Sequence, residues 1–204
     1  PGAQEANSVA SLADGSLLVT IPLHKGIDIS EALAGKLTGQ VYSWSPGDSG
    51  MTPLQGTEMP YANGIEVSAE GKEFYVASSG LFTVTAFSNT NPARVLRSTD
   101  TLAFVPDNLH MGRDGKLVTA GLHVEDDACG RVLQSEEFSL EAFASCPRPF
   151  TVWSIDPRTM QGEALASGPA NPNFSNITMA LEVGGELWIG TFAGDRIAYR
   201  TMDR

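Results

Sequence analysis

The feature that most constrains the fold is a pattern that occurs four times along the chain. Each copy consists of an alternating apolar segment, a turn containing glycine and a second β-rich run. Counted back from the turns Asp14-Gly15, Glu70-Gly71, Asp114-Gly115 and Gly184-Gly185, the copies begin at Asn7, Asn63, Asp107 and Ile177. Alternation followed by such a two-residue turn predicts a β-hairpin. Paired strands that recur every ~40–50 residues are typical of the blades of a β-propeller.

Further β-rich segments extend each hairpin toward a full blade. Third strands are predicted at 39–46, 81–88, 149–157 and 195–202, and fourth strands at 52–58, 93–98 and 162–167. The last repeat has no room for a fourth strand before Arg204, and no spare strand precedes the first repeat to complete it. We therefore expect an all-β propeller fold with about four blades in this chain. Residues 1–204 should form a single domain that lacks its N-terminal blades, which a separate or cleaved fragment would supply.

Composition agrees with a turn-rich β protein and argues against some classes of partner. The chain of 204 residues is 42% hydrophobic and 18% charged, and it contains 21 glycines and 12 prolines. Its net charge of −11 disfavours binding to a nucleic-acid backbone or an anionic membrane surface. No apolar run approaches the ~20 residues that a membrane-spanning helix requires. We expect neither a nucleic-acid partner nor a membrane span.

The chain has two cysteines, Cys129 and Cys146, and both lie in one irregular segment. We predict a disulfide between them, which would stabilise the fold by about 3 kcal/mol in the chain-entropy model. The alternative is two free thiols in a reducing compartment, and the spacing does not favour a zinc site. A disulfide favours a periplasmic or secreted protein.

Two connections between second and third strands are long, at roughly 21–38 and 122–148. In a propeller blade these loops emerge at the same end as the start of the inner strand, so both should overhang Asn63 and Asp107. Helix-like spacing occurs at 28–37, with Ser30 as a predicted N-cap, and at 135–144. We interpret 122–148 as a lid-like insertion, since long loops in compact folds often bind ligands. The alternative is a surface insertion without a role.

The first column of the repeat contains side chains that can bind a metal ion. Equivalent positions of a repeat occupy equivalent places, so Asn63 and Asp107 are expected to face one shared centre. An amide oxygen and a carboxylate suit a hard cation such as Ca²⁺. The alternative is that both residues merely form turns, beside Gly64 and Pro106.

Three stretches resemble six-bladed propeller hydrolases: ANGIEVSAEGKEFYVASSG at 62–80, PDNLHMGRDGKLVTAG at 106–121 and LWIGTFAGDRIAYR at 187–200. The families are the calcium-dependent paraoxonases or arylesterases and the gluconolactonases of the senescence-marker-protein type. The resemblance covers nearly the whole chain and matches the C-terminal portion of these proteins. It implies six blades in the complete protein, a central Ca²⁺ or another divalent cation, and hydrolysis of a small lactone or aryl ester.

The resemblance also carries over individual residues. It implies that Asn63 and Asp107 bind the cation and, on the paraoxonase pattern, that Asn108 does too. A glutamate ligand and the paraoxonase histidine pair would lie upstream of this chain. Ile21 stands where paraoxonases have a further asparagine ligand, so that ligand is lost. Asn7 stands where gluconolactonases have a substrate-contacting asparagine.

The histidines and Asp107 are the candidates for a base that activates water. His123 follows a second strand near the place of a paraoxonase histidine, and Asp107 is the rival base on the gluconolactonase pattern. His24 opens the other long loop and is a candidate substrate contact, whereas His110 lies inside a strand and is expected to pack.

Two alternative functions remain. One is a binding propeller without catalysis, which the loss of the ligand at Ile21 favours. The other is a strictosidine-synthase-like propeller with the same architecture but other chemistry.

Overall fold

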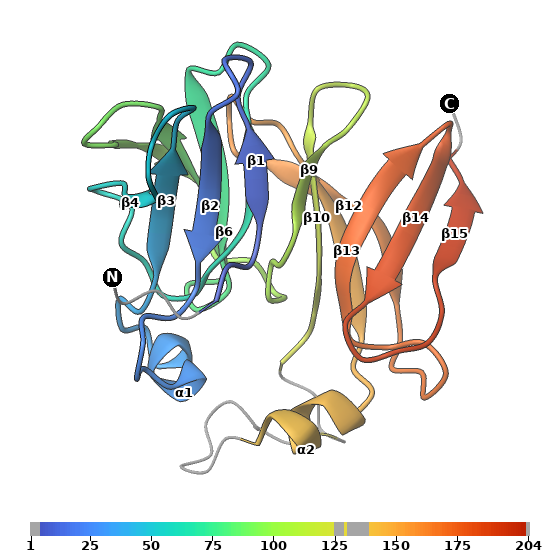
Figure 1. Cartoon of the computed structure of the whole chain (residues 1–204). Coiled ribbons are helices and arrows are strands. Elements are labelled where there is room, and N and C mark those ends of the chain that lie inside the picture. The colour runs from blue at the N-terminus through green and yellow to red at the C-terminus, as the bar shows by residue number, and fades with distance from the viewer. Residues whose placement is uncertain (1–4, 125–128, 130–138, 203–204) are drawn as a thin grey trace. The chain divides into compact units, whose positions relative to one another are not determined.

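The computed structural model describes residues 5–124, 129 and 139–202, which fall into two compact units with their boundary at Thr101 and Leu102. Each unit is built from two antiparallel sheets (Figure 1). In every sheet the neighbouring strands follow one another in sequence, so each sheet is a simple meander. Within the described part of the chain, no helix is long and apolar enough to cross a membrane.

The first unit contains two four-stranded sheets. One consists of β1 (Val9–Ser11), β2 (Leu17–Ile21), β3 (Gln40–Trp44) and β4 (Thr52–Pro53), and the other of β5 (Ala62–Val67), β6 (Glu73–Ser78), β7 (Thr83–Ser88) and β8 (Val95–Ser98). A shared core joins them, in which Leu18 and Val41 of one sheet and Phe74 and Val76 of the other are buried together. Burial does not alternate in the second strands: residues 18–21 of β2 and 74–78 of β6 are buried without interruption, so both faces of these strands are covered.

The second unit contains one four-stranded and one three-stranded sheet. The strands are β9 (Leu109–Met111), β10 (Leu117–Leu122), β11 (Phe150–Ile155) and β12 (Gly162–Gly168), followed by β13 (Ile177–Val183), β14 (Glu186–Thr191) and β15 (Ala198–Thr201). Val118 and Ala120 of β10 pack against Ala180, Leu187 and Ile189 of the last sheet. The predicted third and fourth strands are confirmed, as is a last repeat with three strands in its described residues.

The hairpin turns are correct in place but differ in length from the prediction. The strand registers and backbone hydrogen bonds make residues 13–15 and 113–115 the first and third loops, and 69–72 the second. Only the loop at 184–185 has two residues, because Val183 pairs directly with Glu186. Gly15 lies in the left-handed region at φ 85°, which glycine adopts without strain. A glycine of this kind also ends three-residue hairpin loops, so the sequence motif alone does not set the length.

Two short helices lie in the long connections. Helix α1 (Ile29–Leu33) begins after Asp28, not after Ser30 as predicted: the Asp28 carboxylate accepts from Ser30 N at 2.8 Å, and Glu31 reaches back to Asp28 N at 3.4 Å. This reciprocal capping box satisfies two backbone N–H groups, which a cap at Ser30 would not. Helix α2 (Leu140–Ser145) is capped by Ser139, and the earlier part of the predicted helix at 135–144 lies outside the described residues.

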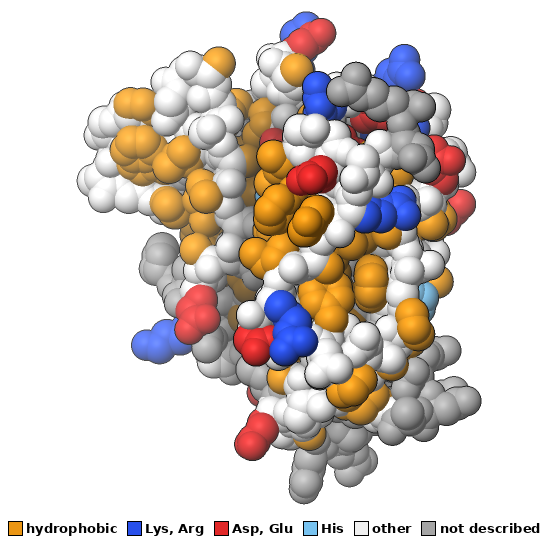
Figure 2. Space-filling model, turned by 90° about the vertical axis from the view of Figure 1, so that its right-hand side faces the viewer, with side chains coloured by type: hydrophobic (Ala, Val, Ile, Leu, Met, Phe, Trp, Pro, Cys, Tyr) orange, Lys and Arg blue, Asp and Glu red, His pale blue; other side chains and the backbone are white. Residues whose placement is uncertain are grey.

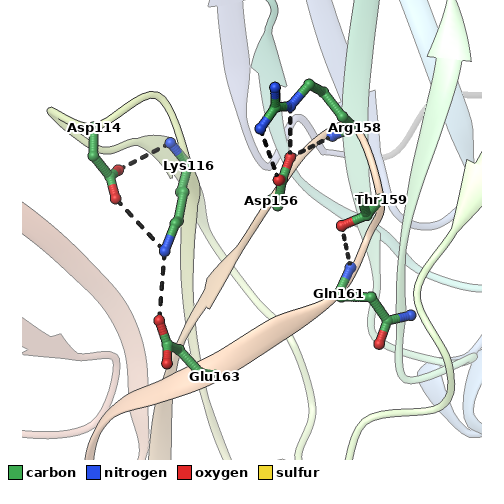
Figure 3. Close-up of polar contacts among 7 residues, drawn as sticks. All are labelled: Asp114, Lys116, Asp156, Arg158, Thr159, Gln161 and Glu163. Carbon is green, nitrogen blue, oxygen red and sulfur yellow. Dashed lines mark hydrogen bonds and ion pairs between the residues drawn. The ribbon is translucent and has the colours of Figure 1, made fainter.

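Exposed ion pairs lie at the hairpin-loop end of the second unit (Figure 3). Lys116 Nζ lies 3.9 Å from Asp114 and 3.4 Å from Glu163, and Arg158 pairs with Asp156 at 3.1 Å. Exposed pairs of this kind contribute only about 0–1 kcal/mol each. We therefore assign this end a structural role.

One face of the last sheet is apolar although solvent reaches it. Strand alternation places Leu181, Trp188 and Tyr199 on the face opposite the core, and the Trp188 and Tyr199 rings stack at 5.3 Å. Tyr199 is 64% exposed and Val183 48%. Figure 2 shows apolar side chains gathered on this side of the molecule. A sheet that is apolar on both faces is typical of one that packs between two others.

Candidate functional site

Asn63 lies where strand β5 bulges, between the register positions of Ala62 and Ile65. Bulges redirect side chains and are common beside functional sites. Asn63 is only 2% exposed, and its Nδ2 donates to Ser79 Oγ at 2.9 Å. Its Oδ1 is buried and has no hydrogen-bond partner in the part of the chain that the structure describes. Because buried polar atoms are nearly always satisfied, this oxygen fits the role of a ligand to a bound cation.

The strand ladders correct the first column of the repeat. In the second repeat, Ala62 pairs with Ser78 at the end of β6, and Asn63 comes directly after Ala62. In the fourth repeat, Ile177 pairs with Thr191 at the end of β14, and Thr178 comes directly after Ile177. Thr178, not Ile177, is therefore the equivalent of Asn63 in the fourth repeat. Ile177 is fully buried in the core. Counting back from the turns failed here because the hairpin loops differ in length and both inner strands are bulged.

Asp107, Asn108 and Thr178 come together in the second unit. Asn108 Nδ2 donates to Asp107 Oδ1 at 3.2 Å and to the Thr178 carbonyl at 3.1 Å. Both partners can only accept, so the amide orientation follows from its surroundings and its oxygen points away from them. The structure thus places Thr178, which sequence reasoning missed, beside Asp107 and Asn108. Asn63 belongs to the other unit, so the shared centre stays a prediction.

Gly121 allows the segment before Asp107 to approach strand β10. A Cβ atom at position 121 would lie 1.6 Å from the Val105 carbonyl oxygen, so only glycine fits. The neighbouring bond from Asp107 N to the Ala120 carbonyl, at 3.1 Å, holds Asp107 at the end of the sheet. The glycine in the TAG stretch is therefore the local reason for the position of the candidate ligand.

His123 directly follows β10. Its Nε2 lies 2.9 Å from Thr151 Oγ1, and its ring lies 6.4 Å from the ring of Phe104. Burial lowers the pKa of His123 below its usual value, because the charged imidazolium loses solvation. Burial therefore favours the neutral imidazole, which is the form that a general base requires. Thr151 was not predicted, since only the β10–β11 register brings it beside His123.

Acidification should weaken the fold partly through His123. The pKa of His123 is lower in the folded than in the unfolded state, where it is about 6.5. The unfolded state then binds the proton more readily, so the free energy of unfolding falls as pH drops below about 6.5. Urea unfolding at pH 7 and pH 5.5 should show a smaller loss of stability for His123→Gln than for the wild type. An equal or larger loss in the variant would contradict this account.

Other predicted site residues lie in the first unit. Asn7 is exposed, and its backbone N donates to the Thr20 carbonyl at 2.9 Å. His24 is half-buried, with its backbone N bonded to the Thr38 carbonyl at 2.8 Å. Their roles in substrate binding stay predictions. Ile21 is 4% exposed and packs with the apolar neighbours of its sheet, in keeping with a lost ligand.

The predicted disulfide is confirmed. Cys129 and Cys146 are bonded, with their Cα atoms 5.8 Å apart and a sequence separation of 17. Cys146 ends helix α2, so the bond ties this helix to the chain after β10. Two parts of the lid-like insertion at 122–148, namely 125–128 and 130–138, lie outside the described residues, and its lid role stays a prediction.

No group of three or more His, Cys, Asp or Glu side chains placed to hold a metal occurs among residues 5–124, 129 and 139–202. The candidate set differs in kind from such a group. It combines one carboxylate, Asp107, with the amide oxygens of Asn63 and Asn108. Oxygen donors of this type match the preference of Ca²⁺ rather than that of zinc.

No protein-family model and no curated protein matches the sequence. Solved structures do match. A gluconolactonase from Xanthomonas campestris is 14% identical with a TM-score of 0.61, over 98% of this chain and 59% of that protein. The calcium-binding protein regucalcin from Agrobacterium tumefaciens is 13% identical with a TM-score of 0.53, over 90% and 52%. Hydrazine synthase from Kuenenia stuttgartiensis is 17% identical with a TM-score of 0.58, over 91% and 43%.

These likenesses concern the fold. This chain spans between 43% and 59% of the three matched chains, so it corresponds to about half of each. Identities this low do not transfer an activity, and hydrazine synthase illustrates that the matched fold occurs in proteins with different chemistry. Together with the four meander sheets, the matches confirm the predicted class: the chain has a β-propeller fold.

Proposed function

We propose that the protein containing this chain is a calcium-dependent hydrolase of lactones or aryl esters. The observation that carries the proposal is the buried Oδ1 of Asn63, which has no hydrogen-bond partner among the described residues. Such an oxygen is costly to bury, by about 1–3 kcal/mol, unless something binds it. The carboxylate of Asp107 beside Asn108 is the second source of cation ligands. The gluconolactonase and the calcium-binding regucalcin among the matched structures support the same reading.

The residues divide into ligands and a base. Asn63, Asp107 and Asn108 would hold the cation, completed by a glutamate from outside this chain. A bound Ca²⁺ would polarise the ester carbonyl and stabilise the negative charge that develops on its oxygen. Neutral His123, held against Thr151, would take a proton from the attacking water and return it to the leaving oxygen. Asp107 is the alternative base.

A non-catalytic binding propeller is the second candidate. Ile21 favours it, because a buried isoleucine stands where the paraoxonase pattern has a ligand.

That further blades precede this chain also stays a prediction. The apolar outer face of the last sheet and the extra length of the matched proteins support it. The disulfide supports, without deciding, a periplasmic or secreted location.

Calcium removal tests the proposal. The full-length protein that contains residues 1–204 is treated with a chelator, dialysed and assayed on a panel of lactones and aryl esters. We expect turnover to disappear without cation and to return with added Ca²⁺. At 100 times the dissociation constant, Ca²⁺ should also stabilise the fold by about 2.7 kcal/mol. Calcium binding without turnover of any substrate favours the binding propeller. Turnover that survives chelation contradicts a calcium-dependent reaction.

A further inference from the structure

The ladder between β10 and β11 is incomplete directly beside His123. Its last paired residues are Leu122 and Phe150, and the hydrogen-bonded pair that comes next is His123 with Pro149. His123 N donates to the Pro149 carbonyl at 2.9 Å. A rung of this kind normally has a second bond in the opposite direction, but proline has no N–H to donate. The backbone after His123 therefore lacks one of the bonds that would hold it to β11.

The side chain of Arg148 supplies a bond at this point. Its Nη1 donates to the carbonyl of Val124, the residue after His123, at 3.1 Å. Arg148 directly precedes Pro149, so its guanidinium binds across the same pair of chains, one residue beyond the incomplete rung. This side-chain bond therefore holds together the two chain segments that carry His123 and Pro149.

Arg148 is itself held firmly. It is 0% exposed, which is rare for arginine. Its guanidinium lies 4.7 Å from the ring centroid of Phe143 in helix α2, within the range of a cation–π contact. Helix α2 is anchored in turn, because the buried amide of Asn176 donates to the Ala144 carbonyl at 2.7 Å. The guanidinium therefore connects an anchored helix to the backbone beside His123.

The position of this backbone decides where the imidazole lies. His123 Nε2 meets Thr151 Oγ1 at 2.9 Å, and Thr151 belongs to β11 on the other side of the incomplete rung. Movement of residues 123–124 away from β11 would lengthen this contact. Displacements of about 1 Å at a reacting group can lower a rate about 100-fold.

We propose that Arg148 is a positioning residue for His123. Its guanidinium bonds the Val124 carbonyl, one residue beyond the bond that Pro149 cannot make, and so keeps the imidazole against Thr151. Arg148 does not touch the substrate. The consequence for turnover rests on the proposed function, in which His123 is the base, whereas the position of the imidazole does not.

Nuclear magnetic resonance of the imidazoles tests the position directly, since the chain has only three histidines. Arg148→Met keeps much of the buried volume but removes the donor. We expect the His123 ring signals and their pH titration to move, while those of His24, in the other unit, stay within error. Arg158→Met is the matched control, because Arg158 is an exposed arginine of the same unit with its side chain 86% accessible. It should leave all three histidines unchanged.

Turnover provides the second measurement in the full-length protein. Arg148→Met should lower kcat about 10-fold or more with KM changed less than about 3-fold, and Arg148→Lys should restore part of the loss. If the wild type hydrolyses no lactone or ester, the proposed function fails, but the imidazole signals still decide the role of Arg148. Unmoved His123 signals in folded Arg148→Met overturn the proposal. A second outcome also overturns it: both Arg148 variants fail to fold, and the His123 ring signals do not move in Phe143→Leu. Arg148 would then serve the fold alone.

Discussion

Replacement of Asp107 by asparagine is expected to lower kcat/KM for lactone hydrolysis about 1,000-fold or more. The variant removes the one carboxylate that this chain offers to the proposed cation, beside the amide oxygens of Asn63 and Asn108. It also removes the rival base, so either assignment of the base predicts a loss. Losses of about 10²–10³-fold follow the removal of a single group that stabilises developing negative charge, and the cation acts on that same charge. Calcium affinity, measured by isothermal titration calorimetry, should fall together with activity.

The Asp107→Asn variant should still fold. Asparagine has the same shape, and its amide oxygen can still accept the bond from Asn108 Nδ2. Asp114→Asn is the matched control, because Asp114 follows at the exposed hairpin loop of the same repeat and contacts Lys116 there. It should keep wild-type activity. Near-normal turnover of Asp107→Asn at saturating Ca²⁺ would remove Asp107 from the mechanism.

Replacement of Gly121 by alanine is expected to destabilise the second unit by about 3 kcal/mol or more. The new methyl group would lie 1.6 Å from the Val105 carbonyl oxygen, and 2.6 Å from the carbon of that carbonyl. Both atoms belong to the backbone, so the strand segment itself must move, and overpacking of this kind costs about 1–3 kcal/mol, occasionally more. Urea unfolding monitored by tryptophan fluorescence measures the change.

Gly190→Ala is the matched control for Gly121→Ala. Gly190 stands at the corresponding place in β14, yet a Cβ atom there meets only the flexible side chain of Met179, at 3.3 Å. We expect a change below about 1 kcal/mol. If the two alanine variants prove equally stable, the close approach at Gly121 is not what places Asp107. A folded Gly121→Ala that binds Ca²⁺ as well as the wild type would lead to the same conclusion.

The strands were predictable because their signals are local. Alternation and glycine turns located all four hairpins, and the third and fourth strands lie where they were predicted, although β4 ends at Pro53 and not at residue 58. The disulfide was also within reach of the sequence, since two cysteines in one segment leave a single intramolecular pairing. The cap of α1 was missed by two residues because Asp28 and Ser30 are both good caps, and the reciprocal bond with Glu31 selects Asp28.

The candidate site was predictable only in part. The sequence by itself determined a repeated β-hairpin chain and named Asn63, Asp107 and Asn108, since motif and repeat position are visible in the letters. Tertiary structure alone decided that Thr178 replaces Ile177 as the fourth equivalent, that Thr151 meets His123, and that Arg148 is buried beside Val124. The reason is physical: bulges and loop lengths change which residues pair across a ladder. Contacts between segments about 25 residues apart or more depend on that pairing rather than on the neighbours in sequence.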